Sequence, residues 1–299
     1  YSAVWAKYAA ERPEECSFCG PEEQVFLASV LPRDAKKCGE KASDTEGFAA
    51  GLSHVRFWAI YLAHFAFNYS VYFVNSWSAT YYLEAFGLRP ENAGLHLSLP
   101  HAVNMLVKVF ASPVLAQSMK AAGMSDLGSR RAFSGLGFLA PALCLQLLPR
   151  ASGSVHLTTA LFSAMLGFMA LHPSGFKANY MDVTRTHGGT VSGIGNTIAS
   201  VASSVGPLLV SQVRMYTGAW GPVFHSVALV NLLAALVFCT LSSTTPIEDE
   251  AGEAGPEPEG QCCKKAQVGR ILRLLRRRPL ASVASARARR AAPQVVDLA

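Results

Sequence analysis

Charged residues are scarce in the middle of this sequence. Only 15% of the 299 residues are charged, whereas soluble domains carry about 25%. The charges concentrate in residues 1–56 and 246–299, and the stretch between them consists of long apolar runs. This distribution excludes an ordinary soluble domain and indicates an all-α, multi-pass membrane protein with polar ends. The formal net charge of +6 does not indicate nucleic-acid binding, because basic residues beside membrane spans set topology.

The sequence also lacks the motifs of common enzymes and metal sites. It contains no P-loop, no H-E-x-x-H and no G-x-S-x-G. Cys16 and Cys19 form a C-x-x-C, but a zinc site needs four ligands and only Cys38 is a plausible third. We therefore predict that the protein is not an enzyme and has neither a cofactor nor a metal.

Six apolar segments are long enough to cross a bilayer, which takes about 20 residues each. Most Lys and Arg residues fall on one side of these spans, and the positive-inside rule makes that side cytosolic. Membrane lipids are thus expected partners, in a membrane that the sequence does not specify. The predicted spans are residues 57–83, 94–116, 132–149, 154–173, 190–213 and 219–241.

The remaining segments suggest four parts. Residues 1–9 look like the end of a preceding transmembrane helix, and residues 10–56 form a charged cytosolic linker. Residues 57–245 hold the six predicted helices. Residues 246–299 form an acidic, then basic tail that we expect to be disordered. A basic amphipathic helix lying on an anionic membrane face is the alternative for its second part.

Polar residues recur on one face of the first span. Five of them lie within an arc of about 80° on a helix, where polar groups normally face the bundle interior or an aqueous cavity. Hydrogen bonds between helices would need only one or two such groups. We therefore expect cavity lining, with interhelical bonding as the alternative. The residues are Tyr61, His64, Asn68, Tyr72 and Asn75.

The second span repeats this pattern and adds a charge. Ser98, His101, Asn104, Lys108 and Ser112 fall within an arc of about 120°. Lys108 lies near mid-membrane, and none of the six predicted spans contains an acidic residue. A buried ammonium group is costly without a partner. The sequence leaves two explanations: a substrate or other anion, or a side chain that extends to the membrane surface.

A polar segment precedes the fifth span. It contains Asn179 and Asp182, and the span then opens with closely spaced glycines. Gly189 and Gly193 form a G-x-x-x-G face, which predicts close approach of a neighbouring helix. Asn196 is predicted to point an amide into the packed interior.

Several motifs together resemble one transporter family. "FLAPALCLQLLP" after "SRRAF", followed by "PSGFKANYMDV" and "GGTVSGIGNTIASVASSVGP", resembles the anion:cation symporter branch of the major facilitator superfamily. That branch includes type I sodium–phosphate cotransporters, sialin, vesicular glutamate transporters and plant plastid phosphate transporters. Its pattern before the eleventh helix is matched by Asn179, Asp182, Gly189, Gly193, Asn196 and Thr197.

The resemblance covers residues 1–245 and implies helices seven to twelve of a twelve-helix transporter. A missing N-terminal half is then expected in the full-length chain. Two departures stand out: Gln117 replaces an Asp of the family's cytosolic charge network, and Phe67 stands where vesicular glutamate transporters resemble one another in having Arg. The second departure weakens a glutamate assignment, because a carboxylate favours a guanidinium fork.

These observations lead to a functional hypothesis. We expect alternating-access transport of an anion, inorganic phosphate first and a small organic anion second, driven by Na⁺ or H⁺. His64, Asn68, Tyr72, Asn75, His101, Asn104 and Lys108 would line the cavity, and His64 or His101 could carry a coupling proton. Asn179, Asp182, Gly189, Gly193 and Asn196 would serve helix packing or gating. The alternative is a non-transporting six-helix scaffold or a degenerate regulatory paralogue.

Overall fold

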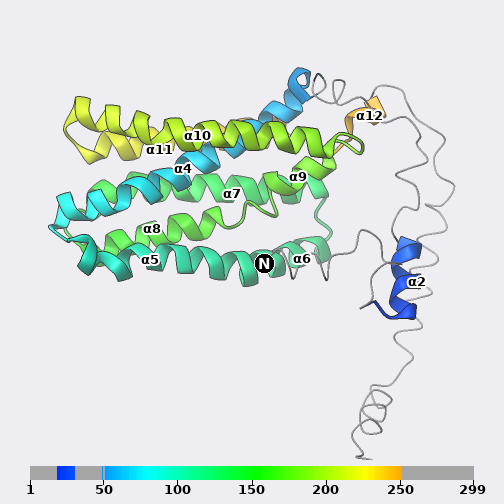
Figure 1. Ribbon diagram of the computed structural model, residues 1–299, viewed down its shortest axis with the longest axis horizontal. Helices are drawn as coiled ribbons and strands as arrows, with labels where there is room; N and C mark the ends of the chain where they lie inside the picture. Colours follow the sequence, from blue (N-terminus) through cyan, green and yellow to red (C-terminus); the bar gives the residue numbers. More distant parts are fainter. Residues whose placement is uncertain (1–18, 31–48, 50, 251–299) are drawn as a thin grey trace, which may run out of the picture. The chain divides into compact units, whose positions relative to one another are not determined.

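The computed structural model describes residues 19–30, 49 and 51–250, and all regular structure within them is helical (Figure 1). This confirms the all-α class. The elements are α2 (Pro21–Val30), α4 (Val55–Phe86), α5 (Pro90–Leu106), the π-helical turn η2 (Val107–Ala111), α6 (Ser112–Ala121), α7 (Asp126–Leu147), the 3-10 turn η3 (Leu148–Ala151), α8 (Val155–Met169), α9 (Phe176–Asp182), α10 (Gly188–Thr217), α11 (Trp220–Leu241) and α12 (Ile247–Glu250). Residues up to Pro246 form one compact unit, and α12 belongs to a second.

Local signals explain where several helices begin and end. The Ser125 hydroxyl accepts the Gly128 N–H at the start of α7, and the Ser154 hydroxyl accepts the Leu157 N–H at the start of α8. Such caps satisfy amides that have no partner within the helix. At its other end, α4 stops at Gly87, whose φ of 66° suits a residue without a Cβ.

The long helices pack side by side as a bundle (Figure 1). Helix α4 packs extensively against both α10 and α11, and α7 packs against both α11 and α8. Helix α5 in turn packs against α8, and the short α9 contacts α4 and α7. The scaffold formed by α7, α8 and α11 therefore holds the helices that carry most of the predicted site residues. These helices are α4, α5, α9 and α10.

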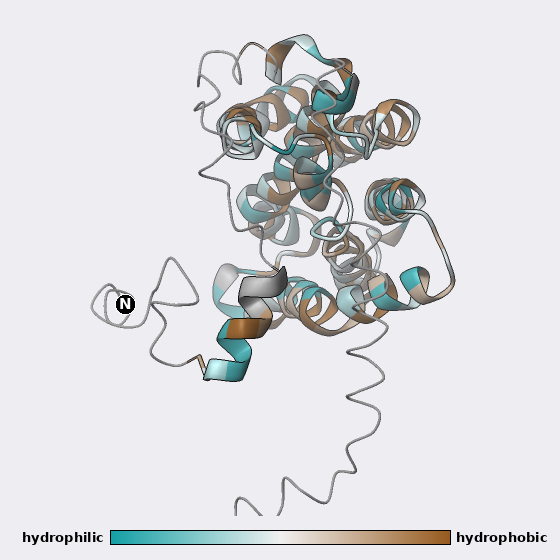
Figure 2. Cartoon of the chain, turned by 90° about the vertical axis from the view of Figure 1, so that its right-hand side faces the viewer, coloured by the Kyte–Doolittle hydropathy of each residue, from teal (hydrophilic) through white to brown (hydrophobic). Residues whose placement is uncertain are grey.

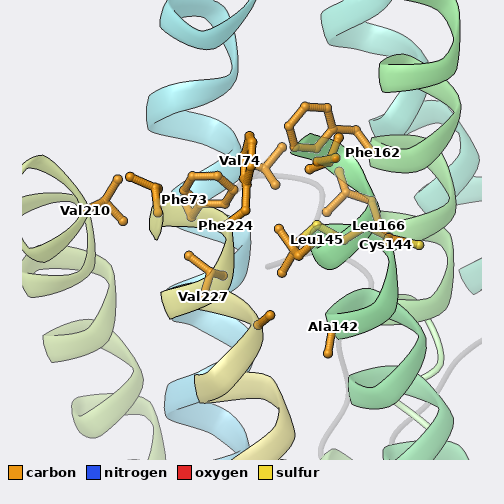
Figure 3. Close-up of a cluster of buried hydrophobic side chains, with 14 of the residues drawn as sticks. Phe73, Val74, Ala142, Cys144, Leu145, Phe162, Leu166, Val210, Phe224 and Val227 are labelled. Atoms are coloured by element: carbon orange, nitrogen blue, oxygen red, sulfur yellow. The ribbon is translucent and has the colours of Figure 1, made fainter. Parts of the chain in front are cut away.

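The largest buried cluster joins α4, α7, α8, α10 and α11 (Figure 3). Phe73 of α4 and Phe224 of α11 meet edge to face, with ring centroids 6.0 Å apart. Leu145 of α7 and Phe162 of α8 extend the cluster. Lipid is as apolar as these side chains, so the cluster stabilises the bundle through van der Waals packing more than through exclusion of water.

The outer faces of the bundle are also apolar. Figure 2, which views the bundle nearly along its helix axes, shows hydrophobic residues on helix surfaces as well as between helices. Leu139 and Leu143 of α7 and Leu229, Leu232 and Leu236 of α11 are all exposed. Contiguous exposed apolar surface of this kind is what a lipid-facing helix presents. The chain is an integral, multi-pass membrane protein.

Four helical segments of the described residues are long and apolar enough to cross a membrane: Glu91–Ala121, Asp126–Ala151, Gly188–Thr217 and Trp220–Leu241. They correspond to four of the six predicted spans. Helix α4 has 32 residues but is rich in polar and aromatic side chains, and α8 has only 15. The count of six spans therefore stays a prediction.

Two predicted spans are interrupted. Residues 154–173 do not form one helix: α8 ends at Met169, and after a turn the chain continues as α9, which contains Asn179 and Asp182. Pro173 explains the break, since proline lacks an N–H and disfavours helical backbone in the residue before it. The span predicted at 94–116 contains the π-helical turn η2, and Pro113 follows it at the start of α6.

Candidate functional site

The polar stripe of α4 divides into a bonded part and an open part. His64 is only 7% exposed, and its Nδ1 lies 3.2 Å from the Tyr180 hydroxyl of α9. The Asn68 amide donates to the Ala199 carbonyl of α10 over 3.0 Å. These two side chains make the interhelical bonds that were the alternative reading of the stripe.

The rest of the stripe is different. Tyr72 is 40% exposed, and Asn75 is exposed. Tyr61, at the N-terminal end of the stripe, is fully buried. Of the five stripe residues, only Tyr72 and Asn75 are therefore exposed.

Helix α5 shows the same division. The Asn104 amide donates to the Leu166 carbonyl of α8 over 2.6 Å and so fastens α5 to its neighbour. Ser112, just beyond the π-helical turn, meets Ser174 at 3.0 Å. His101 and Lys108 are exposed.

Lys108 lies within the π-helical turn, in the middle third of the continuous run from α5 to α6. π-Helical turns are rare and occur frequently at functional sites. Among the described residues Lys108 has no acidic partner, and it takes part in neither of the ion pairs Arg130–Asp182 and Arg214–Glu84.

Lys177 is a residue that the sequence analysis missed. It was counted among the cytosolic basic residues, because the span before it was expected to end at residue 173. The structure instead places its ammonium 4.4 Å from the centre of the Phe67 ring, which lies in the middle third of α4. Ser174, three residues before Lys177, meets Ser112, four residues after Lys108, at 3.0 Å, so the two lysines lie on touching segments. The proline break before α9 was the available signal, but it was read as the end of the span.

A second missed feature is a histidine buried among aromatic rings. His172 has no exposed surface and lies 4.2 Å from Phe138, 5.1 Å from Phe176 and 5.2 Å from Phe67, between ring centroids. Neither ring nitrogen makes a hydrogen bond of normal geometry within the described residues. A Cβ at Gly137 would come within 2.6 Å of the His172 ring, so glycine makes room for it.

A polar network joins α7, α9 and the segment after α11. Arg130 binds both carboxylate oxygens of Asp182, at 2.7 and 3.3 Å, and donates to the Ser174 carbonyl. Asn179 is fully buried and donates to the Ser243 carbonyl over 2.8 Å. The motif residues Asn179 and Asp182 thus belong to one hydrogen-bond network. Within it, the planar guanidinium of Arg130 makes two nearly parallel bonds to the Asp182 carboxylate.

The glycines of α10 do not all act as predicted. A Cβ at Gly189 or Gly193 would meet no described atom within 4 Å, so the proposed G-x-x-x-G contact finds no partner in this part of the chain. The close approach occurs at Gly195, where a Cβ would collide with the Tyr180 side chain. Asn196 is exposed, so the prediction that it points into the packed interior was wrong. Its place on the helix one position after Gly195 turns it outward.

Comparison with known proteins supports the resemblance read from the motifs. No protein-family model matches the chain. It is 27% identical to sialin from Homo sapiens over 79% of this chain and 47% of sialin. It is 27% identical to "Probable anion transporter 6" of Oryza sativa subsp. japonica, over 80% of this chain and 57% of that protein. It is 24% identical to "Ascorbate transporter, chloroplastic" of Arabidopsis thaliana, over 82% of this chain and 44% of that protein.

These similarities support the resemblance to the anion:cation symporter branch of the major facilitator superfamily. It spans about half the length of the curated relatives that it matches. The two plant relatives are named as transporters rather than enzymes.

Proposed function

We propose that the chain is the C-terminal half of a secondary active transporter for an anion, coupled to Na⁺ or H⁺ and working by alternating access. Inorganic phosphate is the favoured substrate and a small organic anion the second choice. The relatives named as anion and ascorbate transporters support this class of activity. The observation that carries the proposal is Lys108, an exposed cation in the middle of a long apolar helix with no acidic partner among the described residues.

The proposed cavity lies along the open face of α4 and α5. Tyr72, Asn75, His101 and Lys108 would contribute its polar groups, since all four are exposed. His64, Asn68 and Asn104 border it and hold α4 and α5 against α9, α10 and α8. His101 is the better placed of the two candidate proton carriers, because its ring is exposed while His64 is engaged by Tyr180.

Replacement of Lys108 tests this assignment. In vesicles that contain the polypeptide expressed from its native gene, Lys108→Ala should reduce phosphate uptake at subsaturating concentration about tenfold or more, because a bond to a charged group contributes about 1.5–3 kcal/mol. Lys120→Ala is the matched control, since Lys120 is an exposed lysine in the last turn of α6. Equal uptake by both variants would remove Lys108 from the site.

The second candidate function is a non-transporting membrane scaffold or regulatory paralogue. Gln117 supports it, since this residue replaces the family's network Asp and makes no hydrogen bond within the described residues. The Arg130–Asp182 pair is nevertheless intact. Purified protein that inserts into vesicles in a folded state but moves no anion under a Na⁺ or H⁺ gradient would favour the scaffold.

A further inference from the structure

We propose that Lys177 and Lys108 together form a binding site for a divalent oxyanion, with Phe67 as the platform on which Lys177 rests. This inference rests on the proposed transport function and specifies its substrate class. Lys177 was not among the residues that the sequence singled out.

The two lysines reach the same region from different elements. Lys177 is the second residue of α9, and Lys108 belongs to the π-helical turn η2. Phe67, below the Lys177 ammonium, lies in the middle third of α4, and Lys108 lies in the middle third of the run from α5 to α6. Ser112, four residues after Lys108, meets Ser174, three residues before Lys177, at 3.0 Å, so the segments that carry the two lysines touch.

No acidic side chain of the described residues neutralises this pair. Asp182 is the acidic residue on α9, and Arg130 engages both of its carboxylate oxygens. A further ion pair joins Arg214 to Glu84, near the opposite end of α4. Two ammonium groups held near each other are unfavourable alone and become favourable when an anion lies between them.

Phe67 explains how Lys177 is held. An ammonium over an aromatic face is attracted by the ring quadrupole, which leaves its N–H groups free to donate to a ligand. The Phe67 ring is itself fixed edge to face against His172, whose ring is fully buried. The platform is thus part of the packed interior, and Lys177 extends from it as an exposed side chain.

Two lysine ammonium groups should favour an anion that carries two negative charges. Each ammonium offers three N–H donors and no acceptor, and lysine binds phosphate as a point charge. An oxyanion with two negative charges and several oxygens, such as phosphate or sulfate, can satisfy both lysines at once. A monocarboxylate carries one charge and can neutralise only one of them. The site should therefore prefer divalent oxyanions over monocarboxylates.

The test compares two anions in the polypeptide expressed from its native gene and reconstituted into vesicles. Lys177→Gln should lower uptake of subsaturating phosphate roughly tenfold, as expected for one lost charge-assisted bond. Uptake of lactate, a monocarboxylate, should fall by much less, so that the phosphate preference is reduced or lost. Lys177→Arg, which keeps the charge, should retain most phosphate uptake, and Lys120→Gln should leave both anions unchanged.

Phosphate binding to the detergent-solubilised protein, measured by calorimetry, separates this inference from the proposed function. Weaker binding of phosphate by Lys177→Gln and by Lys108→Gln, with normal elution of both on size exclusion, supports the paired site. Wild-type binding by Lys177→Gln, combined with lost binding by Lys108→Gln, overturns the paired site and leaves the transport proposal standing. If the wild type binds phosphate through both lysines but transports no anion, the transport proposal fails and the site remains.

Discussion

Single residues decide where helices can approach one another. Gly195 and Gly193 lie two positions apart on α10, yet a Cβ at Gly195 would collide with Tyr180 of α9, while one at Gly193 would meet no described atom within 4 Å. The glycine-rich sequence indicated close packing but not which glycine makes it. The sequence could not identify Gly195, because its partner Tyr180 lies on α9, a helix that none of the predicted spans included.

This pair gives a matched test of packing. Gly195→Ala should lower the thermal unfolding midpoint, because overpacking costs about 1–3 kcal/mol. Gly193→Ala should leave the midpoint unchanged or raise it, since alanine favours a helix by about 0.5–1 kcal/mol relative to glycine. Thermal scans of the two variants in detergent provide the comparison, and an equal loss of stability in both would refute the assignment of the contact to Gly195.

At the scale of elements, the interruptions between and within helices decide where the candidate site residues lie. Composition predicted the position of each apolar segment, because about 20 apolar residues leave few alternatives. It did not predict the turn that separates α8 from α9 or the π-helical turn η2. Pro173 and Pro113 were visible, but a proline inside an apolar segment can kink a helix, break it or do neither, and neighbouring helices decide the outcome. The placement of Lys177 and Asp182 depends on this choice.

The network that holds α9 should contribute to stability. Asp182→Asn removes the charge that Arg130 binds at 2.7 Å, and both side chains are about one-fifth exposed. We expect a loss of about 1–2 kcal/mol, between the values for surface and buried pairs. A double-mutant cycle of Arg130→Ala and Asp182→Ala, followed by thermal unfolding, measures the coupling. Strictly additive effects of the two changes would show that the pair contributes nothing of its own.

At the scale of the whole molecule, the sequence indicated the all-α membrane class and a resemblance to anion transporters. Few charges in the middle, basic residues gathered on one side and a set of ordered motifs were sufficient for that. The candidate site was only partly predictable: Lys108 was recognised from its isolation in an apolar segment, and Tyr72 and Asn75 are exposed, while their lining of a cavity stays a prediction. His64, Asn68 and Asn104 bind neighbouring helices, because helical spacing identifies a polar face but not what lies opposite it.

An aqueous cavity along α4 predicts a pattern of chemical labelling. In a variant without reactive native cysteines, Asn75→Cys should react with a membrane-impermeant maleimide, and phosphate should slow that reaction. Leu236→Cys on the lipid-facing side of α11 should not react, although Leu236 is equally exposed in the described fold. Labelling of Leu236→Cys as fast as Asn75→Cys would show that the α4 face is not distinct from the lipid-facing surface.

The central claim is that this chain moves an anion across a membrane. The most direct measurement is uptake of radiolabelled phosphate by sealed vesicles that contain the polypeptide expressed from its native gene, with an inward Na⁺ or H⁺ gradient. We predict that phosphate accumulates above its external concentration and that the accumulation collapses when the gradient is dissipated. Failure of phosphate and of every small organic anion tested to accumulate, in vesicles whose protein is folded and inserted, would contradict the claim.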